Sequence, residues 1–316
     1  MNAPDHPETA QTRAGDDHSR GGFLLGLGAY GLWGFLPIYF KALAGVSAVD
    51  IVAHRVLWSL PFLALLTMFA RGWDKVRLAF SQPKTLGILA LTALLIATNW
   101  LLYVYAVTSG HILASSFGYY LNPLANVLLG RFVLSERLSR LQWTAVAIAA
   151  AGISVLAAGA AGQLWISLSL CATFAFYGLL RKVVAADAMT GLAVETALLF
   201  PFAVAWLAWR TAAGAASFGS TDGETALLVL AGIVSTTPLL LFTAASKRLP
   251  YSTLGMLQFI APTLQFVIAI LYGEPLKIAH FIAFPAIWIA LALYVSALLR
   301  APKLPQATND VSLSEC

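Results

Sequence analysis

The chain reads Ser115-Ser116-Phe117-Gly118 in its first half and Ser252-Thr253-Leu254-Gly255 in its second half, so one short pattern occurs twice. A proline follows each copy, at Pro123 and at Pro262. An apolar stretch comes next and ends in a glutamate, within Glu136-Arg137-Leu138 or Glu274-Pro275-Leu276. Further upstream, Pro61-Phe62 matches Pro201-Phe202 and Trp33-Gly34 matches Tyr177-Gly178. These matches share an offset of about 140 residues, which indicates an internal repeat.

Composition decides the class of protein that this repeat builds. Of the 316 residues, 59% are hydrophobic and 10% are charged, whereas soluble domains have about 45–50% and about 25%. The mean hydropathy is +0.80. So few charges exclude a soluble surface, and so much apolar side chain excludes disorder over most of the length. The net charge of +5 is too small to indicate a nucleic-acid partner.

Apolar runs long enough to cross a bilayer recur along the whole chain. Spanning a hydrocarbon core of about 30 Å takes roughly 20 apolar residues in a helix. The runs are continuous rather than alternating, which favours helices over a β-barrel. We therefore predict an all-α integral membrane protein with ten transmembrane helices, at about 22–43, 49–70, 85–108, 112–131, 140–158, 163–181, 190–209, 225–246, 251–272 and 277–299.

The repeat and the basic residues together predict the topology. The first copy covers residues 22–158 and the second covers residues 163–299. Because five is odd, the second copy enters the membrane from the opposite side, which makes the repeat inverted. Most lysines and arginines fall on the N-terminal side of the membrane under this scheme, as the positive-inside rule requires. The polar tails 1–21 and 300–316 are then both cytoplasmic, and we expect no cleavable signal peptide.

Several motifs resemble one transporter family when they are taken as a set. The ten-helix repeat, with a proline and then a Glu-x-Leu ending in each half, resembles the EamA-type drug/metabolite transporter superfamily and, within it, the RarD branch. The resemblance implies a small-solute carrier of a bacterial-type inner membrane, and members are commonly labelled chloramphenicol-sensitivity proteins or permeases. The stretches that carry it are His54-Arg55-Val56, Asn99-Trp100-Leu101-Leu102, Leu121-Asn122-Pro123-Leu124, Phe174-Ala175-Phe176-Tyr177-Gly178-Leu179, Thr237-Pro238-Leu239-Leu240 and Thr243-Ala244-Ala245.

Two charged residues lie well inside the predicted spans, and the repeat aligns them. Arg55 and Glu195 each stand six residues before a Pro-Phe pair. A charge at this depth costs at least about 2.5–3.5 kcal/mol, so it marks a candidate site. We predict that Arg55 binds an anionic group of the substrate and that Glu195, with His54 as a weaker candidate, is the proton or ion coupling site. The structural alternatives are that Arg55 binds backbone carbonyls and that Glu195 caps its helix.

Polar and aromatic side chains at similar depth complete the predicted substrate site. Aromatic faces suit flat or cationic solutes, although the same residues also pack helices or anchor them at the interface. Prolines remove a backbone hydrogen bond, so we predict hinges at Pro123 and Pro262, with inert membrane prolines as the alternative. The predicted substrate-binding residues are Arg55, Asn99, Trp100, Tyr103, Tyr119, Asn122, Tyr177 and Gln258.

The motifs that the sequence lacks narrow the function further. It contains no Walker A motif and no HExxH zinc motif, and we expect neither a cofactor nor a metal. The leading hypothesis is a secondary transporter of a small organic solute, such as an amino acid, amine or drug-like metabolite, that works by alternating access in the bilayer, with protons as candidate coupling ions. The alternatives are a gradient-driven facilitator, a regulatory protein on a transporter fold, and a membrane enzyme. A homodimer and a monomer are both compatible with the sequence.

Overall fold

The computed structural model describes residues 7–43, 45–108, 112–157, 164–271 and 278–300. These residues form helices joined by short connections, and no β-strand occurs among them. The helices are α1 (Pro7–Ala42), α2 (Ala48–Phe69), α3 (Trp73–Ser81), α4 (Pro83–Thr108), α5 (Ile112–Phe132), α6 (Arg140–Ala157), α7 (Leu164–Val183), α8 (Ala188–Ala212), α9 (Asp222–Ser246), α10 (Tyr251–Leu257), α11 (Ile260–Leu271) and α12 (Ile278–Arg300).

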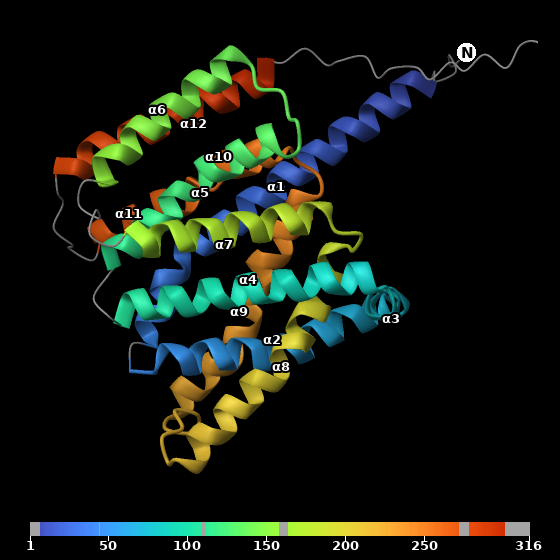
Figure 1. The fold of residues 1–316 in the computed structure, drawn as a ribbon, viewed down its shortest axis with the longest axis vertical. Helices are drawn as coiled ribbons and strands as arrows, with labels where there is room; N and C mark the ends of the chain where they lie inside the picture. The colour runs from blue at the N-terminus through green and yellow to red at the C-terminus, as the bar shows by residue number, and fades with distance from the viewer. Residues whose placement is uncertain (1–6, 44, 109–111, 158–163, 272–277, 301–316) are drawn as a thin grey trace, which may run out of the picture.

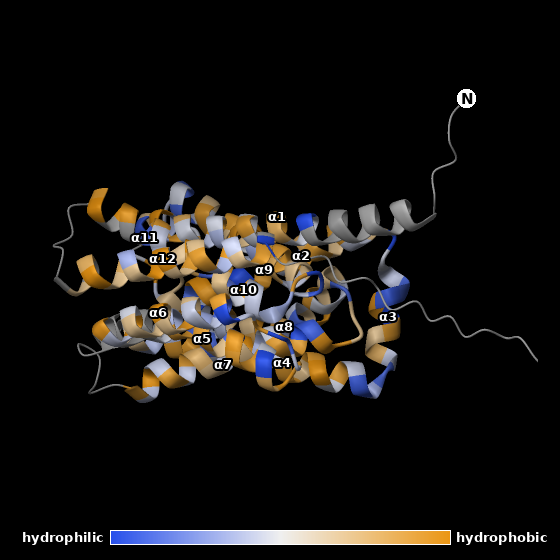
Figure 2. Cartoon of the chain, turned by 90° about the horizontal axis from the view of Figure 1, so that it is seen from above, coloured by the Kyte–Doolittle hydropathy of each residue, from blue (hydrophilic) through white to orange (hydrophobic). Residues whose placement is uncertain are grey.

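Within the described residues, seven helices are long and apolar enough to cross a membrane. They come from α1, α2, α4, α7, α8, α9 and α12, and α6 contributes a shorter apolar helix at Arg140–Val155. Large apolar side chains such as Phe69, Phe202 and Leu271 are at least 74% exposed. Figure 2 shows hydrophobic residues along most of the length of the helices. Such a surface suits lipid, so the chain is a multi-pass membrane protein.

Three features differ from the prediction. The segment 251–272 is two helices, because the helix is interrupted at Gln258 and Phe259, and Pro262 has no N–H with which to bond the Gln258 carbonyl. The polar helix α3 lies in a connection where we expected no helix. Helix α1 begins at Pro7, inside the predicted tail, since proline is favoured in the first turn and the following residues include good helix formers. Residues 301–316 lie outside the described residues, as does Glu274.

Helices from the two halves of the chain pack against each other throughout the molecule (Figure 1). Helix α2 packs on both α8 and α9, α4 packs on α7, and α6 lies beside α12 at one edge. Helix α9 crosses α2 closely at Gly232, where an added Cβ would stand 2.4 Å from the Trp58 carbonyl carbon. Only glycine permits this approach of the two backbones. The inverted relation between the halves stays a prediction.

Candidate functional site

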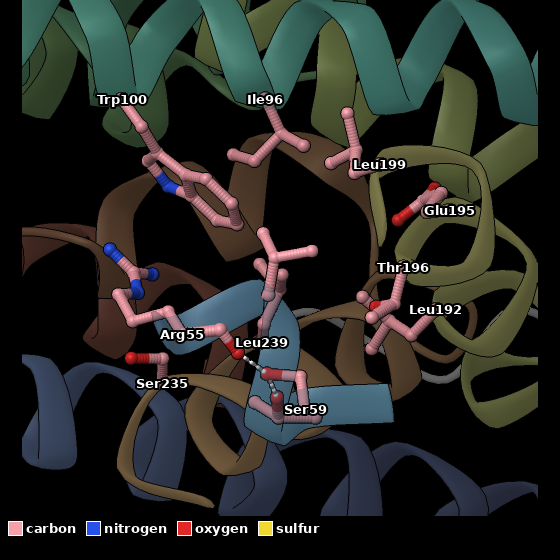
Figure 3. Close-up of a pocket in the computed structure, with 12 residues that line it drawn as sticks. Arg55, Ser59, Ile96, Trp100, Leu192, Glu195, Thr196, Leu199, Ser235 and Leu239 are labelled. Atoms are coloured by element: carbon pink, nitrogen blue, oxygen red, sulfur yellow. Dashed lines mark hydrogen bonds between the residues drawn. The ribbon is translucent and has the colours of Figure 1, made fainter. Parts of the chain in front are cut away.

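A small cavity lies between two helices of each half, at α2, α4, α8 and α9 (Figure 3). We call it the central cavity. Its lining residues are Arg55, Val56, Ser59, Ile96, Trp100, Leu192, Glu195, Thr196, Leu199, Ser235, Thr236 and Leu239. Its volume is about 20 Å³, which is room for about one water molecule. An organic solute therefore fits here only after the surrounding helices move apart.

Arg55 stands on one side of the central cavity and Glu195 on the other (Figure 3). The Arg55 guanidinium lies over the ring of Trp100, with its carbon 4.2 Å from the ring centroid. This cation–π contact stabilises the charge by about 0.5–2 kcal/mol. Arg55 Nε has no hydrogen-bond partner, and no carboxylate of the described residues forms an ion pair with Arg55. The cation in this cavity thus has an aromatic neighbour and no counter-ion.

Glu195, by contrast, is surrounded by partners. Its carboxylate accepts hydrogen bonds from Thr92 Oγ1 at 2.6 Å and from the Tyr177 hydroxyl at 3.4 Å. Its Oε1 also lies 3.5 Å from Arg181 Nε, and both side chains are at most 3% exposed. A buried carboxylate needs such hydrogen bonds and a counter-ion to remain charged. Arg181 is therefore the ion-pair partner of Glu195 in this conformation.

Arg181 is a buried neighbour of the candidate site that the sequence did not reveal, because a basic residue in the last turn of a helix is ordinarily counted toward the cytoplasmic side. It ends α7, yet it is fully buried, and its Nη2 donates to the Ala188 carbonyl at 3.0 Å. Gly191 makes space for it, since an added Cβ would lie 1.7 Å from Arg181 Nη1. One signal was available: Tyr177 and Arg181 are four residues apart on α7, which puts them on one face.

Asp50 is a second carboxylate in the predicted spans, so Glu195 does not stand alone as we assumed. It lies in the first turn of α2, is 1% exposed and pairs with Arg210 at 3.0 Å. The polar lining residues Ser59, Thr196, Ser235 and Thr236 were also missed. Isolated serines and threonines in apolar helices carry no strong sequence signal, because their hydroxyls can bond within their own helix.

The other predicted site residues lie around the central cavity or away from it. Asn99 sits between α4 and α7, where Nδ2 donates to the Leu170 carbonyl at 3.0 Å and Oδ1 accepts from the Tyr119 hydroxyl at 3.1 Å. The ring of Tyr103 is 5.8 Å from that of Tyr119 and its side chain is half-exposed. Asn99 and Tyr119 therefore link α4 to its neighbours and do not line the cavity in this conformation.

The remaining predicted residues belong to the region of α5 and α10. Asn122 is buried with neither amide atom hydrogen-bonded among the described residues, and Gln258 Oε1 accepts from Asn126 Nδ2 at 3.0 Å. Pro123 lies inside α5 and Pro262 in the first turn of α11, just after the interruption at Gln258. Pro262 therefore stands beside a break in the helix, whereas Pro123 lies in a continuous one, and both hinge roles stay predictions.

His54 and Arg55 are neighbours in sequence but do not share a cavity. Successive residues of a helix are about 100° apart, which places Asp50, His54 and Leu57 on the side of α2 away from Arg55 and Ser59, with Trp58 between the two sides. His54 lines a second cavity on that face. Its predicted role in ion coupling at the central cavity consequently finds no geometric support.

Known proteins are similar to this chain over most of its length. Residues 20–158 match the model of the EamA-like transporter family. An uncharacterized transporter of Pseudomonas aeruginosa is 46% identical over 294 residues, which cover 91% of this chain and 97% of that protein. The protein RarD of Escherichia coli K12 is 42% identical over 286 residues, which cover 88% and 94%.

This chain belongs to the EamA-like transporter family. A solved crystal structure is also similar to this EamA-family chain, with a TM-score of 0.69, 19% identity and coverage of 89% of this chain and 99% of the other. At that identity the likeness shows the fold alone. The family and the names of the RarD relatives indicate that this EamA-type protein is a membrane transporter.

Proposed function

We propose that this EamA-family protein is a secondary carrier for a small organic solute that bears a carboxylate or another anionic group. The observation that carries the proposal is Arg55, a cation in a membrane-embedded cavity with an aromatic face beside it and no counter-ion among the described residues. An uncompensated charge at this depth is costly. A substrate anion at Arg55 would lower that cost, and Trp100 would contact the apolar body of the solute.

The neighbouring groups support the assignment of the anion site. Hydroxyls of Ser59, Thr196, Ser235 and Thr236 line the same cavity and provide hydrogen bonds to a polar solute. Thr236 Oγ1 already donates to Ser59 Oγ at 2.6 Å, so the hydroxyls are held in place from two helices. Asn99 and Tyr119 do not contact the solute in this proposal. Their hydrogen bond fixes the position of α4, which carries Trp100.

Transport follows from movement of the two halves relative to each other. Because the central cavity has room for about one water molecule, this conformation is a closed one, and opening to either side would expose Arg55 or Glu195. Pro123 and Pro262 are the proposed hinges, by analogy with other inverted-repeat carriers. We further propose that Glu195 takes up the coupling proton, because a neutral carboxyl would release Arg181.

The test is uptake into proteoliposomes that contain only the purified protein. A thermal-shift screen of amino acids, carboxylates, amines and antibiotics first identifies a solute. We expect Arg55→Ala to abolish its uptake and Arg55→Lys to retain part of it, since a point charge replaces the flat guanidinium. Uptake by Arg55→Ala at the wild-type rate would refute the anion site.

A facilitator without ion coupling is the second candidate, and the same vesicles distinguish it. With coupling through Glu195, a pH gradient drives accumulation and Glu195→Gln abolishes the response to the gradient. If uptake ignores the gradient and Glu195→Gln keeps the full rate, the protein is a facilitator and Glu195 has a structural role.

A further inference from the structure

The short helix α3 lies crosswise to the spanning helices, at the end where α2 stops and α4 starts. These two apolar spans end at Phe69 and begin at Pro83, so the connection that contains α3 lies at the membrane surface. Figure 1 shows α3 nearly end-on at the ends of α2 and α4, and Figure 2 shows it running across them. On the predicted topology, this surface faces the cytoplasm. Helix α3 therefore has the place and orientation of an interfacial helix, which lies in the plane of the lipid headgroups.

One face of α3 is buried and holds the helix in position. Val76 and Ala79 are at most 7% exposed and belong to the main apolar cluster of the protein. Lys75 Nζ lies 3.1 Å from Asp187 Oδ2, and this ion pair ties α3 to the start of α8. The side chains on the remaining surface of α3 are thus presented by a fixed support.

A neighbouring face of α3 carries two exposed aromatic rings with a guanidinium between them. Trp73 and Phe80 are 46% and 41% exposed, and their spacing of seven residues is two helical turns. Arg77 is exposed as well and shares their face, because residues three and four apart are neighbours on a helix. Tryptophan is enriched at the headgroup level of membranes, and a guanidinium can bind a phosphate through two N–H groups. The face therefore matches a phospholipid, with apolar contacts on both sides of its phosphate.

The exposed charges around this face are mostly positive. Arg71 and Lys84 flank α3 and are exposed, as Arg77 is. None of these three cations forms an ion pair with another described residue. Asp74 is the one acidic residue in the stretch 71–84, so an excess of positive charge remains there. An anionic phospholipid supplies the negative charge that these cations lack, whereas a zwitterionic phospholipid has no net charge to offer.

We propose that α3 is a docking site for an anionic phospholipid of the inner leaflet. The lipid phosphate binds Arg77, and the rings of Trp73 and Phe80 contact the glycerol and the adjoining part of the acyl chains. Arg71 and Lys84 add attraction at the two ends of the helix. The site goes beyond the proposed transport function and does not depend on it, because α3 contributes no residue to the central cavity.

The test is native mass spectrometry of the purified full-length protein in detergent. The probes are phosphatidylglycerol and phosphatidylcholine with the same acyl chains, each titrated separately. We expect phosphatidylglycerol to bind more tightly. Arg77→Gln removes one charge and keeps a polar side chain, so it should weaken phosphatidylglycerol binding about fivefold, as for one basic residue at an anionic surface. Its affinity for phosphatidylcholine should stay at the wild-type value.

Trp73 provides a second measurement that is local to α3. The protein is placed in phosphatidylcholine vesicles that contain brominated phosphatidylglycerol, which quenches tryptophan on contact. The difference in quenching between wild type and Trp73→Phe reports the lipid beside Trp73. We expect this difference to exceed the one found with brominated phosphatidylcholine at the same mole fraction. In the Arg77→Gln background the two lipids should give similar differences.

Two controls make the result specific. Arg137→Gln removes one exposed cation from the connection between α5 and α6, on the same predicted side of the membrane, where no aromatic residue stands three or four positions away. It should bind phosphatidylglycerol as the wild type does. Excess glycerol 3-phosphate, which has the charged group without acyl chains, should not displace the lipid.

Four outcomes overturn the proposal. These are equal affinity for the two lipids, wild-type phosphatidylglycerol affinity in Arg77→Gln, an equal loss in Arg137→Gln, and displacement by glycerol 3-phosphate. An equal loss in Arg137→Gln would mean that net charge alone attracts the lipid. Displacement would assign the basic residues to a soluble phosphate. Each of these results leaves the proposed transport function intact, because solute uptake is measured separately.

Discussion

Replacing Gly191 with alanine tests the buried Arg181–Glu195 pair without touching either charge. An added Cβ at position 191 would lie 1.7 Å from Arg181 Nη1 and 2.5 Å from Arg181 Cζ. Both distances are far inside van der Waals contact, so the guanidinium must leave its position. Since Arg181 is fully buried, it has no solvent-filled space into which it can turn.

The expected cost follows from the contacts that Arg181 would lose. Separating a buried charge from its partner costs about 3–5 kcal/mol, and this includes the bond from Nη2 to the Ala188 carbonyl. Alanine in a helix gains about 1 kcal/mol over glycine. We therefore expect Gly191→Ala to lower the free energy of unfolding by about 2–4 kcal/mol.

The assay is equilibrium unfolding of the purified protein in mixed lipid–detergent micelles, followed by tryptophan fluorescence. Gly31→Ala in α1 is the matched control, because an added Cβ there meets nothing within 4 Å, and it should be neutral or slightly stabilising. In an Arg181→Met background the obstacle is an unbranched, flexible chain, so Gly191→Ala should cost less than about 1 kcal/mol. Equal costs in both backgrounds, or no cost in wild type, would refute the reasoning.

Two further predictions concern the cytoplasmic ends of the predicted topology. Burial, with repulsion from Arg181 and Lys182, lowers the pKa of Lys247 to about 8. Between that pH and about pH 10.4, the folded protein has lost a proton that the unfolded chain still holds. The free energy of unfolding therefore rises with pH through this window. Lys247→Met should remove that rise from the pH dependence of the unfolding free energy, and a rise of the same size in the variant would contradict the assignment. Glu136 accepts from the backbone N–H groups of Tyr251 and Ser252 at 2.5 and 3.0 Å, at the start of α10. Glu136→Gln should therefore cost about 1–2 kcal/mol in the same unfolding assay, whereas unchanged stability would mean that this cap contributes nothing.

Hydropathy predicted where helices occur, because the free energy of placing a segment in lipid depends on the side chains of that segment alone. The interruption at Gln258 was missed, although Pro262 was identified as a hinge. The reason is that a missing proline N–H affects the carbonyl four residues earlier, so the break precedes the proline. Consequently Gln258 lies at the break between α10 and α11 rather than inside one continuous helix.

For the candidate site, sequence identified the charges that lie inside the apolar spans, which is why Arg55 and Glu195 were found. Arg181 was assigned to topology because it ends a helix, and a residue there is ordinarily exposed. Its burial results from its contacts with the start of α8, where it donates to the Ala188 carbonyl and fills the space at Gly191. The separation of His54 from Arg55 was available in the helical period and was overlooked.

The amino-acid sequence by itself determined that this chain lies in a membrane, where most of its apolar helices run, and which family it resembles. These properties depend on composition and local periodicity. Only the tertiary structure decided which charges are paired, which are not, and that two separate cavities border α2. Pairing depends on contacts between helices that are far apart in sequence. Because a bilayer requires every spanning helix to be apolar, the hydropathy of a helix does not reveal which helix it packs against.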